Sequence, residues 1–157
     1  MGTFNRILLA VSMAIFSACS PQALEVSRPF YLTYIENSDD SALFRCPKGP
    51  GNGCAIDGLP GPYVFAAGAD SHFVVVARYP KVDGAIDRTR TEYFYFARIP
   101  EETSGWGRNP ERIIGPLTAS DFNRAKAENG LPEFSVDVRR MRGFYRRTSA
   151  AHAVALQ

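Results

Sequence analysis

Asp70, Ser71 and His72 are the three residue types of a hydrolase triad, and they stand next to one another in the chain. In such a site a serine hydroxyl attacks the substrate, a histidine takes its proton and a carboxylate orients the histidine. Neighbours in sequence cannot stack in that relay, and Ser71 lacks the G-x-S-x-G turn of many hydrolases. We therefore expect a hairpin turn in which Asp70 and Ser71 bond to nearby backbone amides.

Paired carboxylates are a second source of hydrolytic chemistry, provided that the fold holds them at a defined separation. The candidates are Asp39 with Asp40, Glu101 with Glu102, and Asp83 with Asp87. Solvated loops are the favoured interpretation for all of them, and the last pair lacks the spacing of an EF-hand calcium loop. No nucleotide-binding glycine motif occurs among the 13 glycines. We predict no catalytic residue, no metal site and no cofactor; an envelope hydrolase with a carboxylate or Ser/His site is the alternative.

The first 18 residues have the layout of a secretory signal peptide. Arg6 is their single charged residue, and a twelve-residue apolar stretch from position 7 to position 18 ends in small side chains. This stretch is shorter than the ~20 residues that a membrane-spanning helix needs. We predict that residues 1–18 direct export and are then removed.

The end of this segment, Phe16-Ser17-Ala18-Cys19, resembles the lipobox of bacterial lipoproteins. Ser17 and Ala18 match its small residues, whereas Phe16 stands where that family usually has leucine. The resemblance implies that the Cys19 sulfur takes a diacylglyceryl group and that cleavage frees an amine for a further acyl chain, such as palmitate. More than one chain gives stable anchoring. Ordinary secretion without a lipid is the alternative.

The residue after the cysteine bears on the destination of such a lipoprotein. In diderm bacteria an Asp at this position often signals retention in the inner membrane, and this chain has Ser20 instead. The resemblance therefore implies a place in the cell envelope, at the outer membrane and facing the periplasm.

Assigning Cys19 to lipid leaves Cys46 and Cys54 as a pair. The segment between them is rich in Pro and Gly, as in a tight loop. An exported domain meets an oxidising compartment, so we expect a disulfide. A metal site is the alternative, but two thiolates separated by seven residues lack the usual close spacing, and only His72 and His152 could add an imidazole.

Composition favours one compact domain and gives no reason to expect nucleic-acid binding. The chain has 157 residues, 45% hydrophobic and 22% charged, with a formal charge of +2. The charge is polarised, because residues 139–157 contain no acid while residues 19–138 hold 12 basic against 16 acidic side chains, a formal −4. The basic tail contains Arg139, Arg140, Arg142, Arg146 and Arg147. It could contact anionic lipid, an anionic envelope polymer or an acidic envelope protein; a solvated tail, or one folded back on the acidic body, is the alternative.

Trp106 is the only tryptophan, and glycines flank it on both sides. Aromatic side chains displayed on such loops are common anchors of protein interfaces. We predict Trp106 as a contact residue.

Aromatic and β-branched runs predict strands over residues 30–35, 42–45, 55–56, 63–67, 72–79, 92–99 and 134–138. Residues 63–67 and 72–79 form the clearest hairpin. The strand 92–99 alternates tyrosine and phenylalanine on its two faces, which indicates cover on both sides. One helix follows, with Thr118 as its cap, Asp121 in its first turn and Gly130 at its end.

This order, with Gly-Pro-Leu-Thr before the helix and Gly-Leu-Pro after it, resembles small uncharacterised envelope lipoproteins that carry a β-meander and one late helix. We predict an α+β fold, a mostly antiparallel sheet with one C-terminal helix packed on it. The expected segments are a signal peptide 1–18, a lipidated tether 19–28, a globular domain 29–138 and a basic tail 139–157. The predicted function is that of a noncatalytic, membrane-anchored binding or accessory module, with a periplasmic enzyme inhibitor as one specific form.

Overall fold

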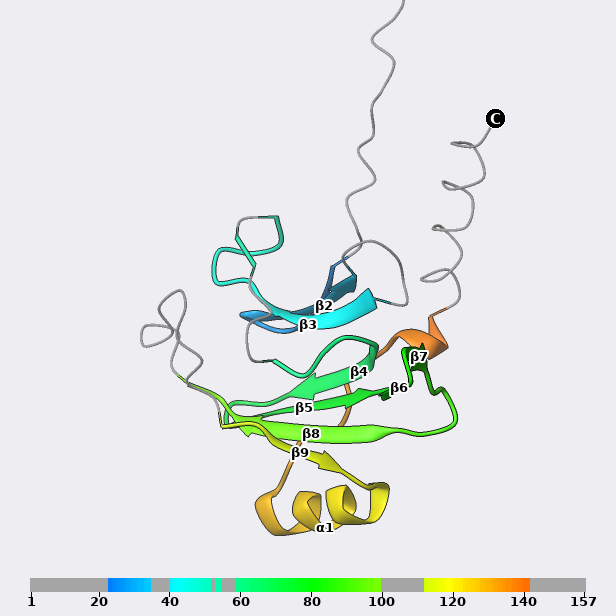
Figure 1. Ribbon diagram of the computed structural model, residues 1–157. Coiled ribbons are helices and arrows are strands. Elements are labelled where there is room, and N and C mark those ends of the chain that lie inside the picture. Colours follow the sequence, from blue (N-terminus) through cyan, green and yellow to red (C-terminus); the bar gives the residue numbers. More distant parts are fainter. Residues whose placement is uncertain (1–22, 35–39, 52, 55–58, 100–111, 142–157) are drawn as a thin grey trace, which may run out of the picture.

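The computed structural model describes residues 23–34, 40–51, 53–54, 59–99 and 112–141. They form three layers, in which a three-stranded sheet and an α-helix lie on opposite faces of a five-stranded sheet (Figure 1). Every strand pairing in both sheets is antiparallel. The predicted α+β fold, with a mostly antiparallel sheet and a C-terminal helix packed on it, is confirmed.

The five-stranded sheet is a meander with one returning strand. Its order is β10-β4-β5-β8-β9, with bounds β4 Val64–Ala69, β5 Phe73–Arg78, β8 Glu92–Ala97, β9 Ile114–Leu117 and β10 Val136–Asp137. β4 and β5 form the predicted hairpin, and β5 pairs with β8 over six residues. β9 was not predicted, because Pro116 lacks the N–H that an inner strand needs; as an edge strand, β9 tolerates it.

Both faces of this sheet are covered, as the alternation in residues 92–99 predicted. Phe94 and Phe96 of β8 face the three-stranded sheet and belong to the main core. Tyr93 and Tyr95 face the helix and the smaller second core, together with Val75 of β5. Because β5 is covered on both sides, four of its six residues are buried and its sequence reads as a continuous apolar run.

The three-stranded sheet consists of β1 Leu24–Ser27, β2 Phe30–Tyr34 and β3 Ser41–Arg45, in that order. Leu32 and Leu43 form a cross-strand pair that is fully buried against the larger sheet. β1 corrects the predicted tether 19–28, because residues 24–27 pair with β2 and pack against the core. The folded domain therefore begins no later than Leu24.

The start of the predicted basic tail also belongs to the domain. After β10 the chain makes a short 3-10 helix, η3 Val138–Arg140, whose Val138 is completely buried. The expected strand 134–138 is thus reduced to two residues, and the boundary placed at residue 139 is wrong. Arg139 and Arg140 belong to this folded element.

The helix α1 Ala119–Asn129 has the caps that the sequence predicts. The Thr118 hydroxyl accepts a hydrogen bond from the Asp121 amide at 3.2 Å, and Gly130 has the left-handed backbone, φ 66°, that ends the helix. One buried side chain, Phe122, fixes the helix to the sheet. Its ring stacks on Tyr93 at 4.9 Å and on Phe134 at 5.7 Å.

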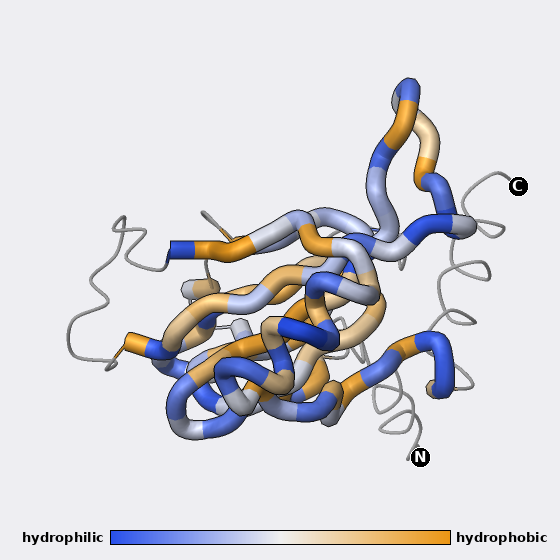
Figure 2. The backbone as a smooth tube through the Cα atoms, turned by 90° about the horizontal axis from the view of Figure 1, so that it is seen from below, coloured by the Kyte–Doolittle hydropathy of each residue, from blue (hydrophilic) through white to orange (hydrophobic). Residues whose placement is uncertain are grey.

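Residues 80–91 contain a small hairpin that was not predicted. Strands β6 Lys81–Val82 and β7 Ala85–Ile86 pair through a two-residue turn, Asp83–Gly84, in which both residues have positive φ. The hairpin projects from the body of the domain, with hydrophobic residues near its polar tip (Figure 2). The strand predicted over residues 55–56 lies outside the described residues.

Candidate functional site

One end of the domain gathers turns from both sheets. We call it the loop end, defined by residues 27–29 between β1 and β2, Cys46 after β3, residues 70–72 between β4 and β5, and Arg98 after β8. The opposite end, the terminal end, is defined by residues 79–91 and 138–141. Strand directions set this arrangement, because β5 runs away from the turn 70–72 and β8 returns toward it.

Arg98 links the turns of the loop end. Its Nη1 donates to the Ser27 hydroxyl at 2.9 Å and to the Asp70 carbonyl at 2.7 Å, while its Nη2 donates to the Arg28 carbonyl. Its own backbone amide donates to the His72 carbonyl at 2.7 Å. The rigid guanidinium fork thus joins three segments from two sheets, a geometry that a lysine ammonium does not reproduce.

Beneath this clamp lies the ring of Phe30, which is 97% buried. The guanidinium carbons of Arg98 and Arg45 lie 5.8 and 5.9 Å from its centroid, within the range of cation–π attraction. Phe96 meets the same ring edge to face at 5.6 Å. The polar surface of the loop end is therefore seated directly on the main core.

The turn 70–72 has the geometry of a turn and does not assemble a catalytic relay. Asp70 Oδ1 accepts hydrogen bonds from the Phe73 and His72 amides, both at 2.7 Å, as predicted for this hairpin. These bonds to the ionised form hold the pKa of Asp70 below its usual range. The Asp70 carboxylate is therefore directed at backbone amides and not at the His72 ring. Ser71 was expected to bond to a backbone amide as well, but its Oγ lies 2.9 Å from His72 Nδ1.

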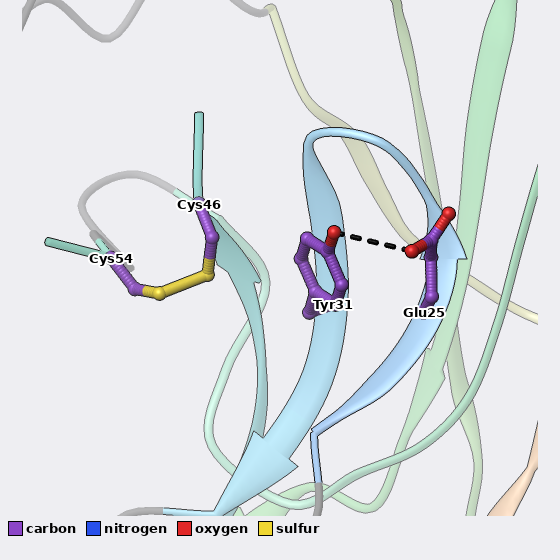
Figure 3. The surroundings of a disulfide bond; sticks show 4 residues. All are labelled: Glu25, Tyr31, Cys46 and Cys54. Atoms are coloured by element: carbon purple, nitrogen blue, oxygen red, sulfur yellow. Dashed lines mark hydrogen bonds between the residues drawn. A yellow bond between two sulfur atoms is a disulfide. The ribbon is translucent and has the colours of Figure 1, made fainter. Parts of the chain in front are cut away.

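The cysteine pair adds a covalent constraint next to the turn between β1 and β2. Cys46 and Cys54 form the predicted disulfide, with Cα atoms 4.3 Å apart. The Cys46 amide donates to the Pro29 carbonyl at 2.7 Å, which attaches the disulfide loop to the turn between β1 and β2. On the neighbouring strands, the Tyr31 hydroxyl donates to Glu25 at 3.2 Å (Figure 3).

Among the residues that the structure describes, the charges displayed at the loop end are mainly basic. Arg28 is 80% exposed and lies 3.5 Å from Glu25, and Lys48 in the disulfide loop and Arg112 before β9 are also exposed. Arg98 adds positive charge to this surface, but its side-chain N–H groups already donate to acceptors within the domain. Chemically, this surface can attract and hydrogen-bond carboxylate or phosphate groups.

Among the described residues, no group of three or more His, Cys, Asp or Glu side chains is placed to hold a metal ion. Within the same ranges, no helix has the length and apolar character that crossing a bilayer requires.

The predicted contact residues are not all brought together. Arg139 and Arg140 lie at the terminal end, because β10 runs antiparallel to β4 and carries η3 away from the turn 70–72. Ile99, which follows Arg98, and Ile114, which pairs with Tyr95, lie at the loop end. Cys19, Trp106, Arg142, Arg146 and Arg147 themselves lie outside the described residues.

Arg139 is committed to the fold. Its guanidinium carbon lies 3.8 Å from the Phe65 ring centroid, and its Nε and Nη2 donate to Asp137 at 2.9 and 2.7 Å. These contacts hold the pKa of Asp137 down and that of Arg139 up. Arg140 reaches the same carboxylate at 3.6 Å but keeps 86% of its side chain exposed.

Sequence reasoning missed that Arg98 and Arg28 share one surface and that this surface lies on the buried ring of Phe30. The available signal was an arginine directly after an aromatic strand, which is not specific.

Comparison of the chain with protein-family models, with curated proteins and with solved structures found no match.

Proposed function

We propose that the chain is a small exported lipoprotein, anchored through Cys19, whose loop end binds an acidic envelope partner without catalysis. The lipobox-like segment supports the anchor, and the Cys46–Cys54 disulfide fits an oxidising compartment. The observation that carries the binding role is the Arg98 clamp. It fixes turns from two sheets in one surface, which reduces the ordering cost of binding.

The charge of the loop end selects the class of partner. Arg28 and Lys48 are exposed there, and Trp106 stands in the sequence between Arg98 and Arg112. Arginine and tryptophan are the side chains that most often dominate interface energetics. An acidic protein surface would meet both a basic patch and an aromatic anchor.

The anchor is tested by the intact mass of the membrane-extracted protein. We expect a chain that begins at Cys19 and carries acyl mass, with Cys46 and Cys54 unreactive toward a thiol-alkylating reagent. A Cys19→Ser variant should lose the acyl mass and leave the membrane fraction. A native chain without acyl groups would refute the anchor and return ordinary secretion as the explanation.

The binding role is tested by site-specific photo-crosslinking in intact cells. A crosslinking residue at Ser71, on the loop end, should give a discrete product with an envelope protein. The same residue at Asn123, which is exposed on α1, is the matched control and should give none. Products from both positions, or from Asn123 alone, would contradict the assignment of the loop end, and a polymer in place of a protein would change the partner class.

An enzyme inhibitor is a specific form of this proposal. The disulfide loop is held to Pro29 and presents Lys48 to solvent, the arrangement of a constrained loop that could enter a cleft. If the crosslinked partner is an enzyme, adding the purified chain should lower its activity, and Lys48→Ala should weaken that effect. If binding of the chain leaves the activity of the enzyme unchanged, the inhibitor form is wrong and the chain acts as an accessory module.

A further inference from the structure

We propose that the terminal end of the domain lies against an anionic membrane surface, so that the loop end faces away from it. The inference rests on the proposed lipid anchor for its orientation and on described residues of the terminal end for its chemistry. It assigns a lipid-contacting surface that is separate from the partner-binding one.

The first argument is the short link between Cys19 and the fold. Because β1 begins at Leu24, five chain positions separate Cys19 from the first strand, and not the ten residues of the expected tether. Five residue steps extend over about 18 Å at most. A lipid on Cys19 therefore holds the start of β1 close to the bilayer.

The second argument is the direction of the strand that carries the anchor. β1 runs toward the loop end, where Ser27 bonds to Arg98, so Leu24 lies on the side of the terminal end. β10 and η3 bring the other end of the described chain, Met141, to the terminal end as well.

The third argument is the composition of the terminal end. Exposed bases stand beside two exposed apolar side chains, Val82 at 39% and Met141 at 42%. The bases are Lys81, Arg88, Arg90 and Arg140. Of the acids, Asp87 accepts from Thr89 and Asp137 from Arg139, while Asp83 is exposed at the hairpin tip, so the four bases outnumber these three acids by one. A projecting hairpin with lysine and valine near its tip is suited to the headgroup region, where bases meet phosphates and small apolar groups enter the interface.

Vesicle binding tests this surface without the anchor. The probe is the Cys19→Ser chain with vesicles of zwitterionic phospholipid alone or containing about one third anionic phospholipid. We expect binding to the anionic vesicles only. Each base near an anionic leaflet contributes about fivefold, so Lys81→Gln with Arg140→Gln should lower the partition coefficient by an order of magnitude or more. The matched pair at the loop end, Arg28→Gln with Lys48→Gln, should change it less than twofold.

Orientation of the acylated chain is tested by quenching from brominated lipids. In a Trp106→Phe background, a Val82→Trp probe should be strongly quenched and an Ile114→Trp probe weakly. These two positions are equally exposed in the free domain, at 39% and 38%. Stronger quenching at Ile114, an equal effect of both charge pairs, or no binding to anionic vesicles would overturn the proposal. Acyl mass and crosslinking from Ser71 do not depend on these results, so the two proposals fail separately.

Discussion

At the loop end the guanidinium of Arg98 is fixed by acceptors from Ser27, Arg28 and Asp70, whereas at the terminal end Arg140 extends with 86% of its side chain exposed. Both residues are arginines at the end of an element of the same domain, since Arg98 directly follows β8 and Arg140 is the last residue of η3. The number of fixed acceptors, rather than the charge, separates a structural arginine from one available to a partner. Arg139 is intermediate, with one ring and one carboxylate.

Loss of the clamp should have the largest effect on stability. Arg98→Ala removes a fork that serves three acceptors, and we expect the free energy of unfolding to fall by about 3 kcal/mol, since hydrogen bonds to charged groups contribute more than neutral ones. Arg98→Lys should recover less than half of the loss. Urea denaturation measures both, and a loss below ~1 kcal/mol for Arg98→Ala would show that the turns hold together without it.

Removing the disulfide should have the next largest effect and should also act on the loop end. Cys46→Ser with Cys54→Ser opens a loop of nine residues, counting both cysteines. The unfolded chain then gains conformational freedom, so stability should decrease by about 2 kcal/mol. Thermal unfolding with and without a reductant measures this. The native chain should respond to the reductant and the double variant should not.

The turn 70–72 should give a smaller effect that depends on pH. Asp70→Ala leaves the Phe73 and His72 amides without their acceptor, and we expect a loss of about 1 kcal/mol at neutral pH. The folded-state pKa of Asp70 is lowered, so its contribution is complete above the unfolded pKa of about 3.9 and is lost as the pH falls through the folded-state value. The difference between native and variant chains should thus shrink below about pH 4. A difference that stays constant on acidification would contradict this origin.

The terminal arginines should give the smallest effects. Arg140→Ala should change stability by less than ~0.5 kcal/mol, because an exposed ion pair contributes little. Arg139→Ala should cost about 1 kcal/mol through the lost stacking on Phe65. Equal losses at the two positions would remove the distinction between a packed and a free arginine. Chemical denaturation of the two variants side by side decides it.

Local signals explain which elements were predictable. Thr118 and Gly130 mark the ends of α1, and the alternation around Phe94 marks β8, because these features act over a few residues. β1 has four residues and weak periodicity, so it was assigned to a tether. The β6–β7 hairpin did have a signal, the Asp83–Gly84 turn, but its strands have only two residues each.

The candidate site was less accessible to sequence analysis. The disulfide followed from counting cysteines, and the hydrogen bonds of Asp70 followed from turn chemistry. The clamp joins Arg98 to Ser27 and Arg28, about 70 positions away in the chain. No local pattern reports a contact over that separation, because it depends on how two sheets stack.

The edges of the five-stranded sheet bear on how copies of the domain behave when crowded. β9 is four residues long and contains Pro116, while β10 at the other edge has two residues. Because the edges are short and one contains proline, they offer no continuous row of backbone donors and acceptors with which a neighbouring chain could pair. The lipid anchor that we propose would confine copies to a two-dimensional surface, where encounters are frequent, and short edges would protect this sheet there against edge-to-edge aggregation.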